Sequence, residues 1–274
     1  MHAYITLDVD PDFTNPNKGW ENARRGIEEC IAIFREFSLE EHITWLVNNA
    51  ELEFTSKRSS YLSKMSVGEI GLHLHLDRPP WSSNYYYLPE KEEKIYAAIK
   101  KEKERLERWT VKNIGREIIS FRSGDFLADD KLFRVLNRLD IKVDSSLPSQ
   151  FDWSLKEIAR KVLSYMPLSV KLAVSKILVN KRAYPTLSLG AKPFMIGRVL
   201  EMPVHVYVGG SNIADGIKKV KIKTHEQIKR GVKDLVIYWH PHEILNRENI
   251  YLGYMEYIVE QGFEFKTLGE SYWR

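Results

Sequence analysis

The sequence predicts an α/β barrel, and three observations support that fold class. Apolar runs that fit buried strands alternate with amphipathic helical segments along most of the 274 residues. The alternation gives roughly seven or eight strand–helix units, without an internal repeat or a linker-like tract, which favours a single domain over 1–274. Reactive residues follow these strands at their carboxyl ends, where barrel enzymes carry their active sites.

The first predicted strand begins at Tyr4 and ends at Asp8 and Asp10, directly before Pro11. Alternate side chains of a strand share a face, so the two aspartates are expected to point the same way. Neighbouring carboxylates repel each other unless a cation or a proton relieves them. One carboxylate that holds a metal and one that handles a proton would explain the pair, and a simple turn at the strand end would explain it equally well.

The later elements continue the alternation. Strands are predicted at 42–47, 69–76, 118–122, 141–145, 199–208, 235–240 and 263–267. Helices are predicted at 21–40, 51–65, 89–112, 129–139, about 225–232 and 248–261. In the first helix Ile27, Ile31 and Phe34 recur at helical spacing and give it one apolar face.

The alternation breaks between Phe151 and Arg198. This segment is rich in lysine, has amphipathic helical character and contains Pro167, Pro185 and Pro193. We interpret it as a helical insertion or lid before the last strands, in contact with substrate or a membrane surface. A solvated helical excursion would explain the same pattern.

Composition and charge exclude several classes of protein. The net charge of +4 comes from 41 basic and 37 acidic residues dispersed along the chain, so no nucleic-acid partner is expected, although a weak preference for anionic substrates is compatible with it. The single cysteine, Cys30, excludes an intramolecular disulfide and is expected to be buried. The chain opens without a signal-peptide pattern and has no apolar run of transmembrane length, so we expect a cytoplasmic location.

Four of the eight histidines form two His-x-His pairs, each at a predicted strand end. His73 and His75 end the strand at 69–76, where their imidazoles share a face. Two imidazoles and a carboxylate with an open position suit zinc, or a similar divalent ion, in a hydrolytic site. A ligand role is therefore expected for His73 and, less strongly, for His75.

Three more polar residues end predicted strands. Arg122 would lower the pKa of Asp8 by about 1–3 units if the two side chains met, although most arginines only pair with surface carboxylates. Asp144 is expected either to pair with Arg122 or to cap the turn at 145–146. His240 is interpreted as a general acid, because imidazole titrates near neutral pH.

Aromatic side chains lie in loops that are predicted on the same side of the barrel. Trp81 and Tyr85 are candidate contacts for the ring of a sugar, and Asp144 is a third candidate substrate contact. Loop aromatics also commonly pack against their own surroundings.

Together these residues resemble the NodB-homology polysaccharide deacetylases, over nearly the whole chain from Thr6 to about Leu268. The matching segments are the acidic end of the first strand, Glu69-Ile70-Gly71-Leu72-His73, Phe121-Arg122-Ser123-Gly124 and the late strand that ends in His240. The resemblance implies an incomplete (β/α)7 TIM-like barrel as the fold. It also implies a metal-dependent hydrolase that removes an N-acetyl group from an amino sugar or a glycan.

The same resemblance implies a role for each matching residue. Asp8 would be the catalytic base, His240 the acid, and Arg122 would position Asp8. Asp10 and His73 would hold a divalent metal ion, with zinc as the first expectation. The substrate would be a carbohydrate in the cytoplasm or at a membrane face, with a non-sugar amide as the alternative.

The sequence departs from the family pattern at one metal ligand. In that family a second histidine follows the first at the fourth position, which is Asp77 when counted from His73. The third ligand is therefore expected to be His75, with Asp77 as the alternative, or to be missing.

Two other functions fit parts of the pattern. A haloacid-dehalogenase-type phosphatase would use Asp8 and Asp10, with Gly124, Asp125 and Asp129 as its later acidic segment. It would leave the histidine pairs unexplained. A barrel that binds glycans without cleaving them is the non-enzymatic alternative. The oligomeric state is not indicated by the sequence.

Overall fold

The computed structural model describes residues 1–15, 17–52, 55, 57–82, 88–149, 187–188 and 190–273. Its strands are β1 (His2–Val9), β2 (Ile43–Asn48), β3 (Glu69–Leu74), β4 (Ser120–Ser123), β5 (Val143–Asp144), β6 (Phe194–Ile196), β7 (Val199–Glu201), β8 (Val204–Tyr207), β9 (Asp234–Trp239) and β10 (Glu264–Phe265). They form one curled sheet in the order β6-β7-β5-β4-β3-β2-β1-β9-β8, and β10 pairs with β1 off this path. All pairings are parallel except that of β6 with β7.

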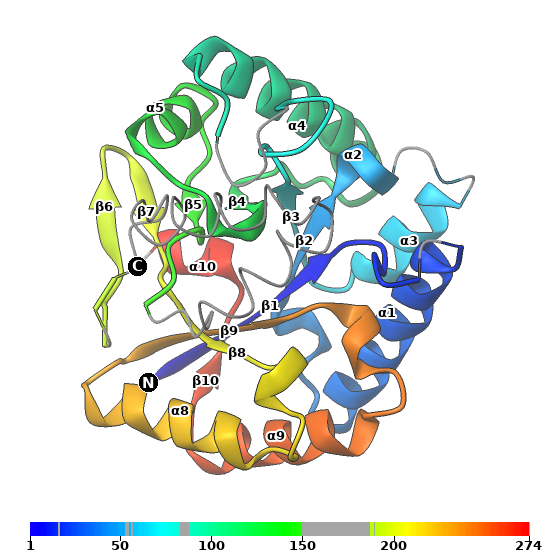
Figure 1. The fold of residues 1–274 in the computed structure, drawn as a ribbon, viewed down its shortest axis with the longest axis vertical. Helices are drawn as coiled ribbons and strands as arrows, with labels where there is room; N and C mark the ends of the chain where they lie inside the picture. The colour runs from blue at the N-terminus through cyan, green and yellow to red at the C-terminus, as the bar shows by residue number, and fades with distance from the viewer. Residues whose placement is uncertain are drawn as a thin grey trace, which may run out of the picture.

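Helices surround this sheet (Figure 1). They are α1 (Gly19–Glu36), α2 (Asn49–Leu52), α3 (Arg58–Met65), α4 (Glu92–Ile114), α5 (Asp130–Arg138), α8 (Lys218–Lys229), α9 (Glu248–Glu260) and α10 (Leu268–Tyr272). Short 3-10 helices lie at η1 (Glu40–His42), η2 (Gly124–Phe126), η3 (Gly210–Asn212) and η4 (Pro241–Ile244). In Figure 1, α4 and α5 lie on one side of the sheet and α8 and α9 on the opposite side. No helix in the described part of the chain is long and apolar enough to cross a membrane.

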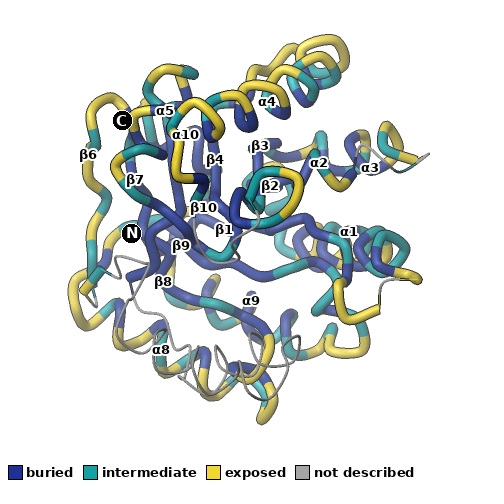
Figure 2. The backbone as a smooth tube through the Cα atoms, turned by 45° about the horizontal axis from the view of Figure 1, so that its top comes forward, coloured by how far each residue is buried: buried dark blue, intermediate teal, exposed yellow. Residues whose placement is uncertain are grey.

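The strands separate two apolar layers. On β1, Ile5 and Leu7 join the large cluster that packs against the helices, whereas Tyr4 joins a second cluster inside the sheet. On β9, Trp239 belongs to the large cluster against the helices, and Tyr238 belongs to the cluster inside the sheet. Because side chains alternate along a strand, the side chains of Thr6 and Asp8, two and four residues after Tyr4, are directed into the barrel as well. Figure 2 shows the central strands buried along their length, β6 mainly exposed at the edge of the sheet, and the outer sides of the helices exposed.

The predicted strand at 199–208 is divided by Pro203, which has no amide hydrogen to donate to a neighbouring strand. Its first half, β7, pairs with β5, and its second half, β8, pairs with β9. Here β8 approaches the segment that follows β5, because Val204 N–H donates to the carbonyl of Leu147 and Ser149 N–H donates to the carbonyl of Val204. The predicted incomplete α/β barrel is therefore confirmed.

Other elements also differ from the sequence prediction. The predicted helix at 51–65 corresponds to two helices, α2 and α3. Strand β6 lies inside the 151–198 segment that was read as helical, of which the structure describes only 187–188 and 190–198. Helix α8 begins at Lys218, ahead of the predicted start near 225. Helix α10 was not predicted, although Thr267 and Glu270 form a capping box at its start.

Helix α10 seals the amino-terminal end of the barrel. Leu268 belongs to the inner apolar cluster, and its N–H donates to Thr44 Oγ1 over 2.9 Å. The N–H of Gly269 donates to Glu69 Oε2 over 2.8 Å. Because Thr44 and Glu69 lie at the starts of their strands, α10 leaves the carboxyl ends as the face on which a site can form.

Candidate active site

Asp10 is the centre of the candidate site. It follows β1 and is almost fully buried, and its Oδ2 lies 3.3 Å from Nε2 of His73 and 3.3 Å from Nε2 of His75 at the end of β3. Burial alone would raise the pKa of Asp10, but the two imidazoles outweigh it and hold this pKa well below its usual value. One carboxylate oxygen is thus shared by two imidazole nitrogens.

Neighbouring groups hold this cluster in place. Nδ1 of His73 lies 3.0 Å from the carbonyl oxygen of Arg122, which can only accept, so Nδ1 donates there and Nε2 is the nitrogen that faces Asp10. Asn48 Nδ2 donates to Oδ1 of Asp10 over 2.7 Å. A Cβ on Gly124 would lie 2.3 Å from Nδ1 of His75, so only glycine leaves room for that ring.

The cluster fits a divalent cation. Within the described residues, Asp10, His73 and His75 each offer one nitrogen or oxygen atom, and these atoms lie within 4.8 Å of one another. Burial lowers the pKa of His75, but the charge of Asp10 outweighs it and raises this pKa to about 10. A cation and a proton would therefore compete for the same imidazole nitrogen. Two imidazoles and one carboxylate are a donor set that zinc and similar ions accept.

Asp8 and Arg122 form a buried ion pair beside this cluster. Arg122 Nη1 lies 2.7 Å from Oδ1 of Asp8, and the arginine is fully buried. Its Nε donates to the carbonyl of Ser145 over 2.8 Å, while Nη2 donates to Thr6 Oγ1 and Ser145 Oγ, each over 2.9 Å. The guanidinium is fixed from three directions, and it fixes one oxygen of Asp8 in turn.

His240 approaches the cluster from β9. Its Nε2 lies 3.9 Å from Oδ2 of Asp10, and its Nδ1 lies 3.3 Å from Oε2 of Glu243. The hydroxyl of Tyr207 donates to the other oxygen of Glu243. Burial lowers the pKa of His240, but its hydrogen bond to Glu243 and the nearby carboxylate charges raise this pKa above its usual value. The imidazole is oriented by one carboxylate and directed toward another.

A glycine lets the His240 segment approach helix α1. Helix η4, which follows His240 directly, packs against α1. A Cβ on Gly26 of α1 would lie 2.1 Å from the carbonyl oxygen of Pro241. The position of His240 therefore depends on the absence of a side chain at Gly26.

Asp77 lies on the other side of His75, away from Asp10 and His73. Nδ1 of His75 is 4.0 Å from Oδ1 of Asp77 and 3.6 Å from Oδ2 of Asp125. Asp125 also accepts from Arg78 Nη2 over 2.8 Å. Of the two alternatives for the third ligand, only His75 belongs with Asp10 and His73 to one group of candidate ligands in the described residues. Asp77 belongs to a second such group, with His75 and Asp125.

Of the expected substrate contacts, the structure describes Asp144 and Trp81. Asp144 is fully buried beside Glu201 and accepts from Ser146 Oγ over 2.8 Å, so it caps the turn at 145–146 and presents no surface to a substrate. Trp81 is half-buried against the outer core, and Lys101 Nζ lies 5.4 Å from its ring centroid. Tyr85 lies outside the described residues.

Two contributors were missed by the sequence reasoning. Asn48 is the last residue of β2, and the same rule that singled out the ends of the other strands would have found it. Ser145 binds Arg122 through both its carbonyl and its hydroxyl, and no motif signalled that role.

Comparison with known proteins supports the fold. No protein-family model and no curated protein sequence matches this chain. A solved structure of a candidate polysaccharide deacetylase from Mycobacterium smegmatis is similar with a TM-score of 0.60 and 12% sequence identity, covering 98% of this chain and 87% of that chain. The polysaccharide deacetylase Bc1974 from Bacillus cereus gives a TM-score of 0.42 and 12% identity, covering 97% of this chain and 91% of that chain. The first of these likenesses shows that the chain has the fold of the polysaccharide deacetylases.

Proposed function

We propose that this chain is a hydrolase of the polysaccharide deacetylase type, which uses a divalent cation to remove an N-acetyl group from an amino sugar or glycan. One observation carries the proposal: three imidazoles from β3 and β9 surround one oxygen of Asp10 within 3.9 Å. The Asp8–Arg122 pair stands beside them at the same end of the barrel. These groups come from distant parts of the sequence, which is the arrangement that the family resemblance requires.

The cation would be held by Asp10, His73 and His75, with zinc as the first candidate. Bound there, it would polarise the acetyl carbonyl and so favour attack by water. Zinc accepts this donor set and leaves a position for substrate.

Asp8 would accept the proton from the attacking water. Arg122 holds one oxygen of the Asp8 carboxylate at 2.7 Å, which fixes the orientation of the other oxygen. A base that is held in place in this way contributes to rate through positioning as well as through proton transfer.

His240 would supply the proton that the leaving nitrogen needs. The carbon–nitrogen bond breaks, the proton moves from Nε2 to the amine, and acetate is the other product. Glu243 supports this role, because a carboxylate on Nδ1 favours the protonated imidazole.

The proposal is tested by acetate release from N-acetylglucosamine oligomers. We expect release by protein loaded with zinc and loss of release after chelation, with recovery when the ion is added back. Protein that retains the ion yet releases no acetate from any N-acetylated glycan would favour the silent glycan-binding barrel. Protein that takes up no ion would exclude the proposed chemistry.

The phosphatase alternative is less well supported by the geometry. Asp125 pairs with Arg78 and lies behind His75, so the later acidic segment does not join Asp8 and Asp10. A labelled phosphoenzyme trapped on Asp8 would nevertheless decide in favour of that alternative.

A further inference from the structure

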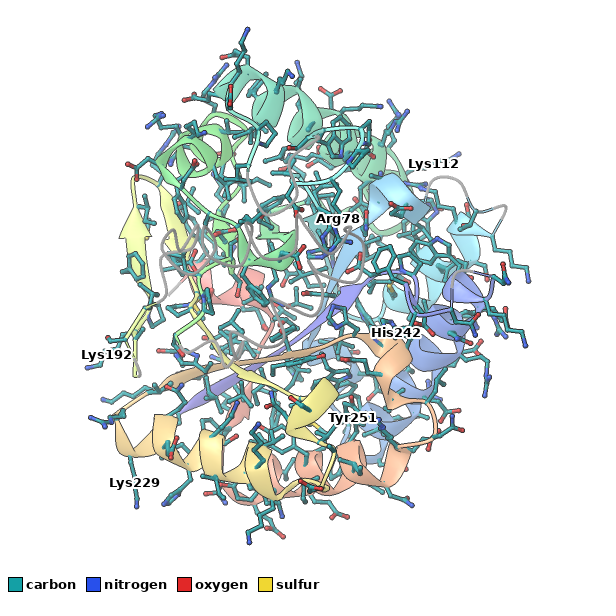
Figure 3. The ribbon with its side chains drawn as sticks, in the orientation of Figure 1. Arg78, Lys112, Lys192, Lys229, His242 and Tyr251 are labelled. Atoms are coloured by element: carbon teal, nitrogen blue, oxygen red, sulfur yellow. The ribbon has the colours of Figure 1, made fainter. Side chains whose placement is uncertain are left out.

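A cationic groove lies between α3 and α4, on the outer side of the helix layer. Its cavity of about 390 Å³ is lined by Arg58 of α3 and by Arg105, Arg108 and Lys112 of α4, with Trp109 beside them. The described lining contains no carboxylate. Figure 3 shows Lys112 at the outside of the molecule.

Two of the arginines are held in place from beneath. Arg58 Nη2 donates to Asn49 Oδ1 over 2.9 Å and to the carbonyl of Arg105 over 3.2 Å. Arg105 Nη1 donates to Glu102 Oε1 over 3.1 Å, and Asn49 Nδ2 donates to the other oxygen of Glu102 over 2.8 Å. Asn49 and Glu102 are both buried, so they anchor the two guanidinium groups to the protein core.

The other two cations are not compensated. Both are exposed, and among the described residues no carboxylate lies within 4.0 Å of Arg108 or Lys112. Elsewhere on α4, Lys103 pairs with Glu107 over one helical turn. Arg105, Arg108 and Lys112 are spaced so that they share one face of the helix. Four cations therefore line the hollow, and two of them, Arg108 and Lys112, pair with no carboxylate in the described part of the chain.

We propose that this groove binds a phosphate group, carried either by a soluble molecule or by a lipid headgroup. Guanidinium groups donate to phosphate oxygens in pairs, and arginines that are already positioned lose less freedom on binding. An anion would also relieve the repulsion among the four cations. Trp109 offers an apolar surface for whatever carries the phosphate. The groove is separate from the candidate active site, so the proposal does not depend on the proposed function.

The test compares two double variants of the full chain, each with two cations removed. Arg108→Gln/Lys112→Gln alters the groove, and Lys218→Gln/Lys229→Gln removes the same charge from exposed positions on α8. Calorimetric titration with inorganic phosphate measures the affinity of each protein for a soluble phosphate. Sedimentation with phosphatidylcholine vesicles, with and without phosphatidic acid, measures the affinity of each protein for a phosphate carried by a lipid headgroup.

We expect the groove variant to bind inorganic phosphate, or the vesicles that contain phosphatidic acid, at least tenfold more weakly than the α8 variant and the unaltered chain. Loss in the vesicle arm alone identifies a lipid headgroup, and loss in the phosphate arm identifies a soluble ligand. Equal weakening by both variants, or no binding by the unaltered chain in either arm, overturns the proposal. Circular dichroism of both variants verifies that they are folded.

Discussion

Two aspartates that are one residue apart have different surroundings. Asp8 contacts a guanidinium, whereas Asp10 contacts two imidazoles and an amide. The strand period places both carboxylates on one face, and the partners that β3 and β4 bring then distinguish them. The sequence pattern predicted a proton for one carboxylate and a cation for the other as one of two explanations, and these different surroundings are compatible with that prediction.

Substitution of Asp8 tests that division. Asp8→Asn should keep the bound cation and slow acetate release by about 10²–10⁴-fold, because an amide cannot accept the proton. Asp10→Asn is the matched variant at the neighbouring carboxylate and should lose the cation as well. Metal analysis and acetate release separate the two effects. Near-normal release by Asp8→Asn would exclude Asp8 as the base.

The buried pair of Asp144 and Glu201 makes stability depend on pH. Burial and the charge of Asp144 raise the pKa of Glu201 well above its usual value, and burial raises the pKa of Asp144. The folded state therefore holds a proton that the unfolded chain releases. The stability that this proton provides is complete below the ordinary carboxyl pKa and is lost as pH rises through the raised pKa.

Glu201→Gln should weaken that pH dependence. The amide cannot ionise, yet it can still donate to Asp144 and accept from Leu147 N–H, whose present bond to Glu201 is 3.0 Å. Urea unfolding from about pH 5 to pH 9 should show a smaller fall in the free energy of unfolding than in the unaltered chain. Glu260→Gln, at an exposed position of α9, should leave the fall unchanged. If the free energy of unfolding falls equally with pH in all three proteins, Glu201 does not hold the proton that stabilises the folded state.

At the scale of elements, close contacts between backbones position the site. Gly26 lets α1 approach η4, and Gly124 makes room for the ring of His75. Neither glycine is distinguished in the sequence from one in an ordinary helix or turn. The first contact joins Gly26 to Pro241 and the second joins Gly124 to His75, so both depend on segments that are distant in the sequence, and local patterns could not predict them.

Gly26→Ala should disturb both stability and turnover. The added methyl group would meet the carbonyl of Pro241 at 2.1 Å, so the free energy of unfolding should fall by about 1–3 kcal/mol. Acetate release should also slow, because η4 begins directly after His240. Gly253→Ala is the matched control on α9, where the nearest atom is 3.6 Å away and alanine should add about 0.5–1 kcal/mol. Equal effects of the two substitutions would exclude the close contact as the cause.

Strand boundaries were the weakest part of the sequence prediction. The predicted strand at 199–208 contains Glu201, Pro203 and His205 among its apolar residues, and its pairing with two different neighbours shows that Pro203 divides it. Helix α10 is short, and its apolar residue Leu268 is buried by the barrel rather than by a helical partner. Propensity and period carry no information about such neighbours.

At the scale of the whole molecule, the alternation of strands and helices was enough to predict the barrel. It also predicted which end carries the reactive residues, because parallel strands place all their carboxyl ends together. The histidine pair, Arg122 and His240 were found by that rule. Asp144 also ends a strand, yet it is buried beside Glu201, which strand order alone does not reveal. Trp81 and Tyr85 stay predictions, since loop positions do not follow from strand order.

Cation binding should stabilise the whole fold. An ion that binds only the folded state at 100 times its Kd adds about 2.7 kcal/mol, so zinc should raise the Tm by a few degrees. Chelation should reverse the shift. His73→Ala should abolish it, and an equal shift in that variant would show that the ion binds elsewhere.

The pairing of β1 bears on how the chain reaches its native state. This strand lies between β2 and β9, so Ala3 stands opposite Leu235 although most of the sequence separates them. To form contacts between such distant residues, the chain must lose much conformational entropy before the interaction energy of the contacts is gained. Such contacts therefore slow folding. During synthesis on the ribosome, β1, which carries Asp8 and leads into Asp10, must wait for its neighbour β9 until synthesis has reached residues 234–239.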